Sequence, residues 1–297
     1  MIVLVTNRRD LTTDYIVREL EARSLSYVRL NTEALGSAEI VLRPDRPQDD
    51  LLEIEGQALK LDEVTAAYFR RPEAPQAAEG VGPPATQAYC AAEWAALLKT
   101  LVGRFDGLWF NDPSAIVRAE DKPRQLLAAG RLGFRVPATV ITNRPDVARP
   151  FLAVPGRIAK PLRQALIESP DGGQVMFTTR LDTAGLGSDA GIAAAPVILQ
   201  QEITKACDLR VTVVGDRLFC VAIGSQAHDE TQVDWRRGVR PDLLHESTTL
   251  PAEIAKACLD LTRDLGLRFG AIDLVRTPEG EHWFLEINPN GQWAWIE

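Results

Sequence analysis

Hydrophobic and polar positions follow two different periods in the first thirty residues of the chain. Residues 2–6 form a short apolar run that predicts a strand, and the next segment carries apolar positions at helical spacing. Thr12 or Thr13 can cap this helix, and a second apolar run at residues 26–31 predicts another strand. The resulting β-α-β order is typical of a small α/β domain.

The same periods continue along the rest of the chain without an internal repeat. Strands are predicted at residues 39–44, 50–56, 66–72, 156–162, 195–203 and 208–225, the last of these a hairpin that turns at Gly215 and Asp216. Helices are predicted at residues 83–105, 121–133 and 251–266, with Pro123 in the first turn of the second helix.

The final predicted hairpin, residues 270–288, places polar side chains on one face. If residues 278–281 form its loop, Asp273 lies directly opposite Glu286. Asn288 then shares the face of Glu286, because side chains alternate along a strand. Cross-strand partners lie about 5 Å apart, so two carboxylates at these positions repel each other. A slip of one residue in the register removes this pairing.

This pair of acids has more than one interpretation. One carboxylate could be protonated, or the hairpin could lie on the surface with both acids solvated. Alternatively, the pair binds a hard divalent cation, since magnesium typically takes one or two carboxylates together with phosphate oxygens and water. The opposite face of the hairpin favours the metal site because it is apolar, with Ile272, Leu274, Leu285 and Ile287.

Composition narrows the class of protein. The 297 residues allow two or three domains, and the formal net charge of -8 argues against non-specific binding to nucleic acid or to an anionic membrane. No stretch approaches the roughly 20 apolar residues of a membrane span, and the first apolar run is too short for a signal peptide. The four cysteines form no C-x-x-C pair and the three histidines are scattered. A zinc site and a disulfide framework are therefore not expected. This cysteine usage fits a protein of the reducing cytoplasm.

A magnesium site of this kind calls for phosphate, and three features could contact one. Lys122 opens a predicted helix, where a lysine opposes the helix dipole unless an anion is near. Lys160 is a lone charge between apolar residues, and the backbone N–H groups of Gly172 and Gly173 could fold over phosphates, although the sequence G-x-x-x-x-G-K-[ST] is absent. Each feature by itself also fits a surface lysine or an ordinary turn.

Arginines supply further candidates. Arg210 alternates with apolar residues in a predicted strand, and Arg236, Arg237 and Arg240 lie in one loop. All four can be ordinary surface residues. Alternatively, Arg210 binds a carboxylate or a transferring phosphate, and the loop forms an anion clamp at the mouth of a site.

The order of these features resembles the ATP-grasp superfamily over nearly the whole chain. Two lysines, a glycine loop, the strand "VILQQEI", "DLR" and the final acids follow one another in that order. The resemblance implies an α/β (α+β) ATP-grasp fold with an N-terminal pre-ATP-grasp α/β domain at residues 1–113. A central subdomain with the glycine-rich loop would follow at residues 114–195, and a C-terminal subdomain with the metal site at residues 196–297.

Three shorter segments narrow the resemblance. "YFRRP", "DWR" and "EINPNGQW" look like segments of the graspetide synthetases, the microviridin-type maturases that cross-link a ribosomal precursor peptide. That family usually continues with another helix beyond "GQWAWIE", so either the chain is shortened or this member is short. Gln201 stands where related enzymes often have glutamate, so that an adenine contact there would depend on backbone atoms.

The resemblance also implies a role for each matching residue. The phosphates of ATP would be contacted by Lys122 and Lys160 and covered by Gly172 and Gly173. The adenine would be held by Gln200, Gln201 and Ile203. The ribose would lie near Asp208. Two magnesium ions would be held by Asp273, Glu286 and Asn288. As catalytic and substrate-binding residues, Arg210 would steady an acyl phosphate and Arg236 would hold the peptide or the transferring phosphate, with Asn290 bordering the metal site on the substrate side.

The implied activity is an ATP-dependent, ADP-forming ligation in the cytoplasm. A carboxylate of an Asp or Glu side chain of the precursor would attack the γ-phosphate of ATP, and the acyl phosphate would react with a Ser or Thr hydroxyl or a Lys amine of the same peptide. The partner would be a precursor with a leader segment, and a homodimer is expected by resemblance. Two alternatives stay open: another ATP-grasp ligase that extends a carboxylate with an amino acid or small peptide, and a non-catalytic ATP-binding module. A dinucleotide-dependent oxidoreductase is not favoured, because G-x-G-x-x-G is missing after the first strand.

Overall fold

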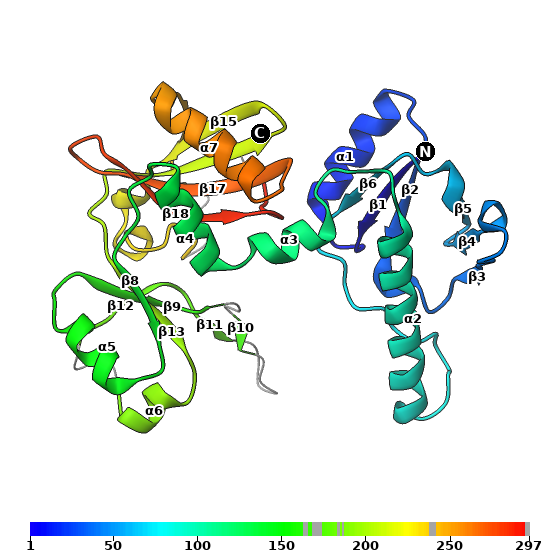
Figure 1. The fold of residues 1–297 in the computed structure, drawn as a ribbon, viewed down its shortest axis with the longest axis horizontal. Coiled ribbons are helices and arrows are strands. Elements are labelled where there is room, and N and C mark those ends of the chain that lie inside the picture. The colour runs from blue at the N-terminus through cyan, green and yellow to red at the C-terminus, as the bar shows by residue number, and fades with distance from the viewer. Residues whose placement is uncertain (163–165, 168–173, 183–184, 186, 238–241, 295–297) are drawn as a thin grey trace. The chain divides into compact units, whose positions relative to one another are not determined.

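The chain divides into two compact units, each described here by itself (Figure 1). The structure, a computed structural model, describes residues 1–162, 166–167, 174–182, 185, 187–237 and 242–294. Unit 1 comprises Met1–Arg118, Gly266–Phe269 and Pro289–Glu297, and unit 2 comprises Ala119–Leu265 and Gly270–Asn288. The three-part division with boundaries at residues 113 and 195 stays a prediction.

Unit 1 is built on a parallel sheet. Its strands run in the order β2-β1-β6-β7, and each neighbouring pair is parallel. The bounds are β1 (Ile2–Thr6), β2 (Tyr27–Asn31), β6 (Ala66–Phe69) and β7 (Leu108–Trp109). A small antiparallel sheet consists of β3 (Glu39–Val41), β4 (Leu51–Ile54) and β5 (Gln57–Lys60). The helices are α1 (Leu11–Ala22), α2 (Pro84–Arg104) and α3 (Pro113–Ala119), with 3-10 helices at Thr32–Ala34, Pro47–Asp49 and Leu61–Glu63.

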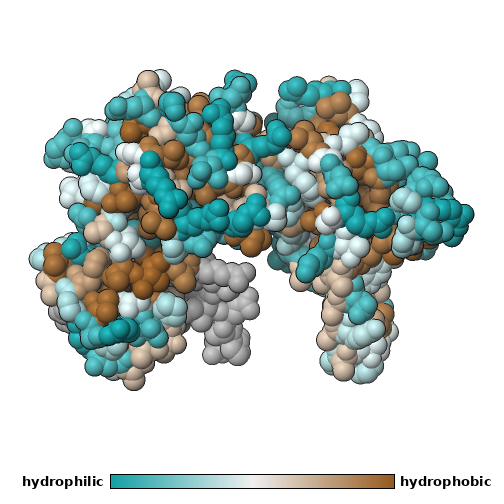
Figure 2. Space-filling model, viewed as in Figure 1, coloured by the Kyte–Doolittle hydropathy of each residue, from teal (hydrophilic) through white to brown (hydrophobic). Residues whose placement is uncertain are grey.

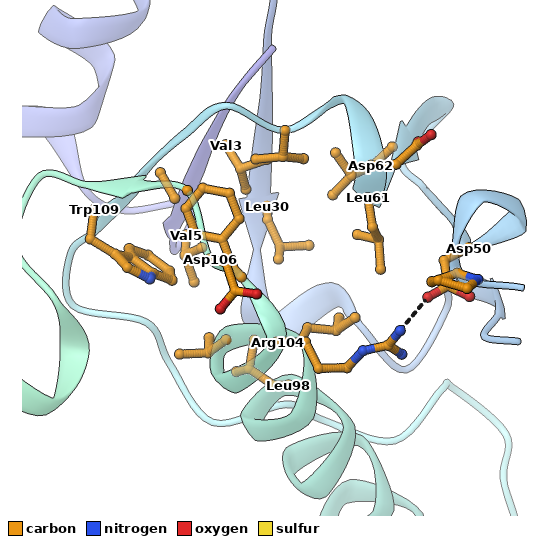
Figure 3. Close-up of a pocket in the computed structure, with 18 of the residues that line it drawn as sticks. Val3, Val5, Leu30, Asp50, Leu61, Asp62, Leu98, Arg104, Asp106 and Trp109 are labelled. Atoms are coloured by element: carbon orange, nitrogen blue, oxygen red, sulfur yellow. Dashed lines mark hydrogen bonds and ion pairs between the residues drawn. The ribbon is translucent and has the colours of Figure 1, made fainter. Parts of the chain in front are cut away.

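An apolar cavity lies beside the core of unit 1. Val3, Val5 and Leu30 of the parallel sheet are buried in that core, and Leu98 of α2 packs against it. The cavity, about 490 Å³ in volume, is lined by these side chains and ends at the ion pair between Arg104 and Asp50 (2.8 Å; Figure 3). A lining of this kind suits apolar contacts rather than phosphate chemistry.

The first part of unit 2 is an antiparallel sheet with helices against it. The strand order is β12-β9-β13-β8, with bounds β8 (Thr139–Thr142), β9 (Arg157–Lys160), β12 (Thr179–Arg180) and β13 (Val197–Gln201). The helices α5 (Pro145–Leu152) and α6 (Asp189–Ala193) close a small core around Ala148, Leu152, Ile192 and Leu199. Two short strands, β10 (Leu166–Ile167) and β11 (Gln174–Val175), pair with each other.

The second part of unit 2 is a five-stranded sheet covered on one face by two helices. Its order is β16-β15-β14-β17-β18, with bounds β14 (Cys207–Val214), β15 (Arg217–Ile223), β16 (His245–Thr248), β17 (Phe269–Arg276) and β18 (His282–Asn288). The helix α7 (Ala252–Asp264) packs on β14 and β15, and α4 (Lys122–Arg131) packs on β18 and α7 (Figure 1). Short 3-10 helices lie at Ser225–Ala227 and Asp229–Thr231. β18 is an edge strand of this sheet.

Most of the predicted elements are confirmed, and one predicted cap is wrong. The β-α-β opening is present, and Gly133 (φ 88°) and Gly266 (φ 74°) follow α4 and α7 in the left-handed conformation that favours glycine. The N-cap of α1 is Asp10, not Thr12 or Thr13: its carboxylate accepts a hydrogen bond from the Thr12 N–H. Asp10 lies two and three positions before these threonines, whose hydroxyls have other partners: Thr13 Oγ1 donates to Asp10 Oδ2 (2.7 Å), and Thr12 Oγ1 accepts from Arg70 Nη2 (3.1 Å).

The visible surface of both units is largely hydrophilic, with smaller hydrophobic areas between the polar side chains (Figure 2). Such a mixture is ordinary for a globular protein. In the part of the chain that the structure describes, none of the helices combines the length and the apolar character needed to cross a membrane.

Candidate active site

The hairpin of β17 and β18 places two acids opposite each other, as expected, but its predicted loop at residues 278–281 is wrong. Arg276 pairs with His282 and the Thr277 N–H donates to the Glu281 carbonyl (2.9 Å), so the loop is one residue shorter. Asp273 pairs with Glu286, and Ala271 pairs with Asn288. The two pairs are two residues apart along each strand, so their side chains project from the same face of the sheet. Two carboxylates and an amide therefore share one face.

A β-bulge next to this pair was not expected. The register shifts between Asp273 and Leu274, so that Leu274 pairs with Phe284 and Leu285 has no cross-strand partner in the ladder. Phe284 is fully buried and takes the apolar position that the sequence assigned to Leu285. Bulges next to active sites re-aim side chains, and this one follows directly on the acidic pair.

The neighbouring strand β14 adds a buried arginine to the same face. Arg210 Nη1 donates a hydrogen bond of 2.8 Å to Asp273 Oδ1, and both side chains are buried. Thr212, two residues further on, shares the face of Arg210, and its buried hydroxyl has no hydrogen-bond partner in the described structure. Buried hydroxyls without a partner are uncommon in proteins.

Glu286 is surrounded by cations from three other parts of unit 2. Its Oε2 lies 3.7 Å from Lys122 Nζ, and its Oε1 lies 3.4 Å from Arg236 Nη1. Burial would raise the pKa of Glu286, but the charges of Arg236, Lys160 and Lys122 outweigh burial and lower it to about 2. Glu286 is therefore an anion throughout the physiological pH range.

Of the two predicted lysines, Lys122 contacts this acid, and Lys160 lies near enough for its charge to act on it. Lys122 is the first residue of α4, and its Nζ also donates to the Pro161 carbonyl (3.2 Å). Lys160 ends β9, and its pKa is lowered chiefly by burial, while the charge of Glu286 opposes that shift. Both lysines therefore place their amines on the side of Glu286, where an anion could bind.

Arg236 is held by two carboxylates at once. Its Nε donates to Asp234 Oδ1 (2.9 Å), and its Nη1 faces Glu286. Burial opposes its charged form, but Glu286 and Asp234 together raise the pKa of Arg236. Among the described residues, Arg236 is the one arginine of the predicted clamp that is shown at this acid.

The predicted adenine-binding segment lies at the end of β13. Gln200 is buried, and its Nε2 donates to Thr139 Oγ1 (2.8 Å). Gln201 accepts from the Ala138 N–H through Oε1 (3.4 Å), and the half-buried Ile203 follows the strand. The side chain of Gln200 is thus engaged within the sheet, which leaves backbone groups after β13 as the candidates for a ligand.

The predicted ribose contact is engaged by a lysine. Asp208 is buried, and both of its carboxylate oxygens accept from Lys205 Nζ, at 2.9 and 2.7 Å. Burial raises the pKa of Asp208, and the charge of Lys205 counteracts this shift. A ribose hydroxyl that binds Asp208 would have to share its carboxylate with Lys205.

The remaining predicted residues are not described at this cluster. Gly172 and Gly173, like Arg240, lie outside the described residues. Asn290 belongs to unit 1, where its backbone carbonyl accepts from Arg70 Nη1 (3.1 Å).

Several buried partners of these residues were not predicted. Lys205 and Asp234 each hold a predicted residue, and Gln125 of α4 bonds to the backbone of β18. For Lys205 the spacing of three residues to Asp208 was a usable signal. For Gln125 there was none, because its partner is 162 residues away.

The polar face fits a magnesium ion that arrives with phosphate. Within the described residues, no three His, Cys, Asp or Glu side chains gather closely enough to hold a metal by themselves. Two carboxylates and an amide oxygen are hard donors, and magnesium usually completes its shell with phosphate and water. The cations exceed the carboxylates at this face, and an excess of positive charge suits a polyphosphate. The carboxylates are those of Asp234, Asp273 and Glu286, and the four cations are Lys122, Lys160, Arg210 and Arg236.

Known proteins share part of the sequence of this chain. No protein-family model matches the chain. A probable alpha-L-glutamate ligase of Klebsiella pneumoniae is 29% identical over 181 residues, which are 60% of this chain and 58% of the relative. The match therefore spans less than two thirds of the curated relative's length.

Solved structures are similar over almost the whole chain. The macrocyclase MdnC from Microcystis aeruginosa MRC, bound with the precursor peptide MdnA, is 26% identical with a TM-score of 0.87, over 100% of this chain and 93% of that chain. A RiPP-associated ATP-grasp ligase of Chryseobacterium gregarium, in complex with ADP and a leader and core peptide, is 25% identical with a TM-score of 0.90, over 99% and 90%. The ATP-grasp ligase PsnB, with magnesium, ADP and a precursor variant, shares the fold at 22% identity and a TM-score of 0.78, over 99% and 92%.

These likenesses confirm the fold expected from the sequence. The chain has the mixed α/β ATP-grasp fold, matched to MdnC over its full length. It is related to the microviridin-type macrocyclases and more distantly to the glutamate ligases, as the order of its motifs indicated.

Proposed function

We propose that this protein is an ADP-forming ATP-grasp ligase that closes cross-links in a ribosomal precursor peptide. One observation carries the proposal: the facing pair Asp273 and Glu286 lies on the same sheet face as Arg210, and Lys122 and Arg236 converge on Glu286. The full-length likeness to the macrocyclase MdnC, solved with a precursor peptide, and to a RiPP-associated ATP-grasp ligase, solved with a leader and core peptide, supports the peptide substrate.

The residues of the site have distinct tasks in this proposal. Lys122 and Lys160 bind the phosphates of ATP, while Asp273, Glu286 and Asn288 hold magnesium. When bound, magnesium neutralises charge on the phosphate oxygens and orients them for in-line displacement. Phosphoryl transfer needs mainly positioning and charge, which agrees with a site rich in fixed cations.

Two substrate reactions follow one another. A carboxylate oxygen of an Asp or Glu side chain of the precursor attacks the γ-phosphorus, the bond to the bridging oxygen breaks, and ADP leaves. A hydroxyl or amine of the same peptide then attacks the acyl carbon, loses its proton, and releases inorganic phosphate. Arg210 steadies the acyl phosphate, and Arg236, on its exposed side, receives the acidic peptide.

The remaining residues predicted from the sequence also have roles in this proposal. Gln200, Gln201 and Ile203 border adenine, Gly172 and Gly173 cover the phosphates, Asp208 lies near the ribose, and Asn290 contributes to the substrate side. The relatives contain ADP and magnesium, and we propose two magnesium ions here. We also propose that the precursor has a leader segment, that the protein is a cytoplasmic homodimer, and that its domains are residues 1–113, 114–195 and 196–297.

A second candidate activity has support of its own. The curated relatives are glutamate ligases, which makes extension of a carboxylate by an amino acid the alternative. Their match covers 60% of this chain, whereas the likeness to the macrocyclase MdnC covers all of it. We therefore favour ring closure.

Mass spectrometry separates the two activities. The protein is incubated with magnesium, ATP and an acidic precursor peptide rich in Thr and Ser, with and without free glutamate. Ring closure removes one water from the peptide for each ATP consumed. A gain of one residue mass that requires free glutamate would instead identify the extension activity.

A further inference from the structure

Gln125 of α4 bonds to the backbone of β18 at the residue between two proposed metal ligands. Its Nε2 donates to the Ile287 carbonyl (2.8 Å), and its Oε1 accepts from the Ile287 N–H (3.0 Å). Nε2 also donates to the Ala119 carbonyl (2.6 Å), and the residue is only 3% exposed. All three bonds are made to main-chain atoms, so they fix the backbone whatever side chains stand there.

These bonds replace a strand that β18 lacks. β18 is an edge of the five-stranded sheet, so its outward backbone groups have no neighbouring strand. Buried backbone groups without a partner are costly, and Gln125 satisfies both groups of Ile287 with one side chain. Further along the same edge, the Phe284 N–H donates to the Arg135 carbonyl (2.9 Å), close to the end of α4.

The same helix turn carries one of the proposed ATP-binding lysines. Lys122 precedes Gln125 by three residues and therefore lies on the same side of α4. Its Nζ lies 3.7 Å from Glu286 Oε2, and Glu286 is the residue before Ile287. One helical turn thus contacts β18 at two consecutive residues, once through a charge and once through an amide.

We infer that Gln125 is a positioning residue, which holds Glu286 and Asn288 on the edge strand in register with Lys122 on α4. This inference rests on the proposed ligase function. The reason is geometric: the two ligands flank Ile287, so any slide or rotation of α4 against the strand changes their distance from the lysine. Residues that orient metal ligands in this way typically contribute 10–100-fold to metal affinity.

The test compares a variant that keeps the shape of Gln125 with one that keeps its amide. Gln125→Met preserves side-chain length and packing but removes all three hydrogen bonds. Gln125→Asn keeps the amide on a side chain one methylene shorter, which cannot reach both groups of Ile287. Leu127→Ala, on the same helix at a side chain that is 64% exposed, is the matched control.

Two measurements are made on each folded protein: calorimetric affinity for ADP in the presence of magnesium, and hydrogen exchange of the β18 amides. We expect Gln125→Met to bind magnesium–ADP about 10–100-fold more weakly and to exchange the Ile287 amide faster, with Leu127→Ala equal to the native protein. Gln125→Asn should fall between the two. In turnover, the KM for ATP should rise more than kcat falls.

The outcomes separate this inference from the function on which it rests. A Gln125→Met protein that is less stable but binds magnesium–ADP with native affinity would show a purely structural role and overturn the inference. If Gln125→Met does not fold, native affinity and native Ile287 exchange in Gln125→Asn overturn it equally. A native protein that binds no magnesium–ADP would overturn the proposed function itself.

Discussion

The guanidinium of Arg210 donates a hydrogen bond of 2.8 Å to the carboxylate of Asp273, and both side chains are buried. The sequence alone suggested two facing acids that repel each other. In the structure each acid has its own cations, Arg210 for Asp273 and Lys122 with Arg236 for Glu286. Removing Asp273 therefore leaves the buried charge of Arg210 uncompensated rather than relieving a repulsion.

The first prediction concerns stability at this pair. Asp273→Asn should lower the free energy of unfolding by about 2–4 kcal/mol, because breaking a buried ion pair leaves its partner charged and unpaired. Urea unfolding at neutral pH measures this change. Asp146→Asn, at an exposed ion pair, should change stability by less than about 1 kcal/mol. Equal effects of the two substitutions would contradict the buried pairing.

Glu286 gives the second prediction, on pH. Its folded-state pKa of about 2 lies below the ordinary value, so its contribution to stability is complete above the unfolded pKa of about 4.3 and is lost as pH falls toward 2. Native protein should therefore lose stability more steeply between pH 4.5 and 2 than Glu286→Gln, a range set by these two values. Denaturant unfolding across that range measures the slopes, and parallel curves would refute the depressed pKa.

The third prediction concerns Lys160. Because burial lowers the pKa of this amine, it should lose its charge, and ATP affinity should fall, at a lower pH than the usual lysine value of about 10.4. Lys160→Met should raise the KM for ATP at least about 10-fold at neutral pH. Lys160→Arg should keep ATP affinity constant at alkaline pH, since arginine does not deprotonate there.

A control for the lysine lies in unit 1. Lys99→Met changes an exposed lysine of α2 and should leave the KM for ATP unchanged. An alkaline loss of ATP affinity that persists in Lys160→Arg would assign the titration to another group.

The fourth prediction concerns a buried arginine in unit 1. Arg70 is completely buried; it pairs with Asp10 (3.0 Å) and donates to the carbonyls of Asn290 and Gly291. Arg70→Lys cannot make all these bonds and should cost about 2–4 kcal/mol in thermal or urea unfolding. Arg23→Lys, at an exposed ion pair of α1, is the control and should be neutral. A neutral Arg70→Lys would mean that the carbonyl contacts contribute nothing.

Asp10 adds a pH dependence to the same cluster. Burial raises its pKa, but the hydrogen bond from Thr13 and the charge of Arg70 outweigh burial and lower it. This pair should therefore stabilise unit 1 above the ordinary Asp pKa of about 3.9 and lose that contribution on acidification.

Local patterns were sufficient for much of the fold and for the central pair of the site. Alternation and an assumed loop at residues 278–281 predicted Asp273 opposite Glu286. The pairing is present although the loop is one residue shorter, because the bulge at Leu285 shifts the register back by one. Glycine positions marked the ends of α4 and α7. The bulge at Leu285 was not predicted, because a strand of alternating residues carries no local signal for one unpaired position. The helix α5 was also not predicted, since Pro145 and Pro150 both lie within its eight residues.

Long-range partners could not be predicted from sequence spacing. Gln125 reads as an ordinary helix residue, and its role depends on β18 being an edge strand, which only the assembled sheet defines. In the same way, Arg70 of "YFRRP" and the carbonyls of "NPNG" look unrelated in sequence and are bonded in unit 1.

The central claim is that this site couples ATP cleavage to ring closure, and peptide mass measured together with ADP release tests it most directly. Native protein, magnesium, ATP and an acidic precursor should give one ADP for each water lost from the peptide, and Glu286→Gln should give neither product. Hydrolysis of ATP without loss of water from any acidic peptide would contradict the account, and so would native turnover by Glu286→Gln.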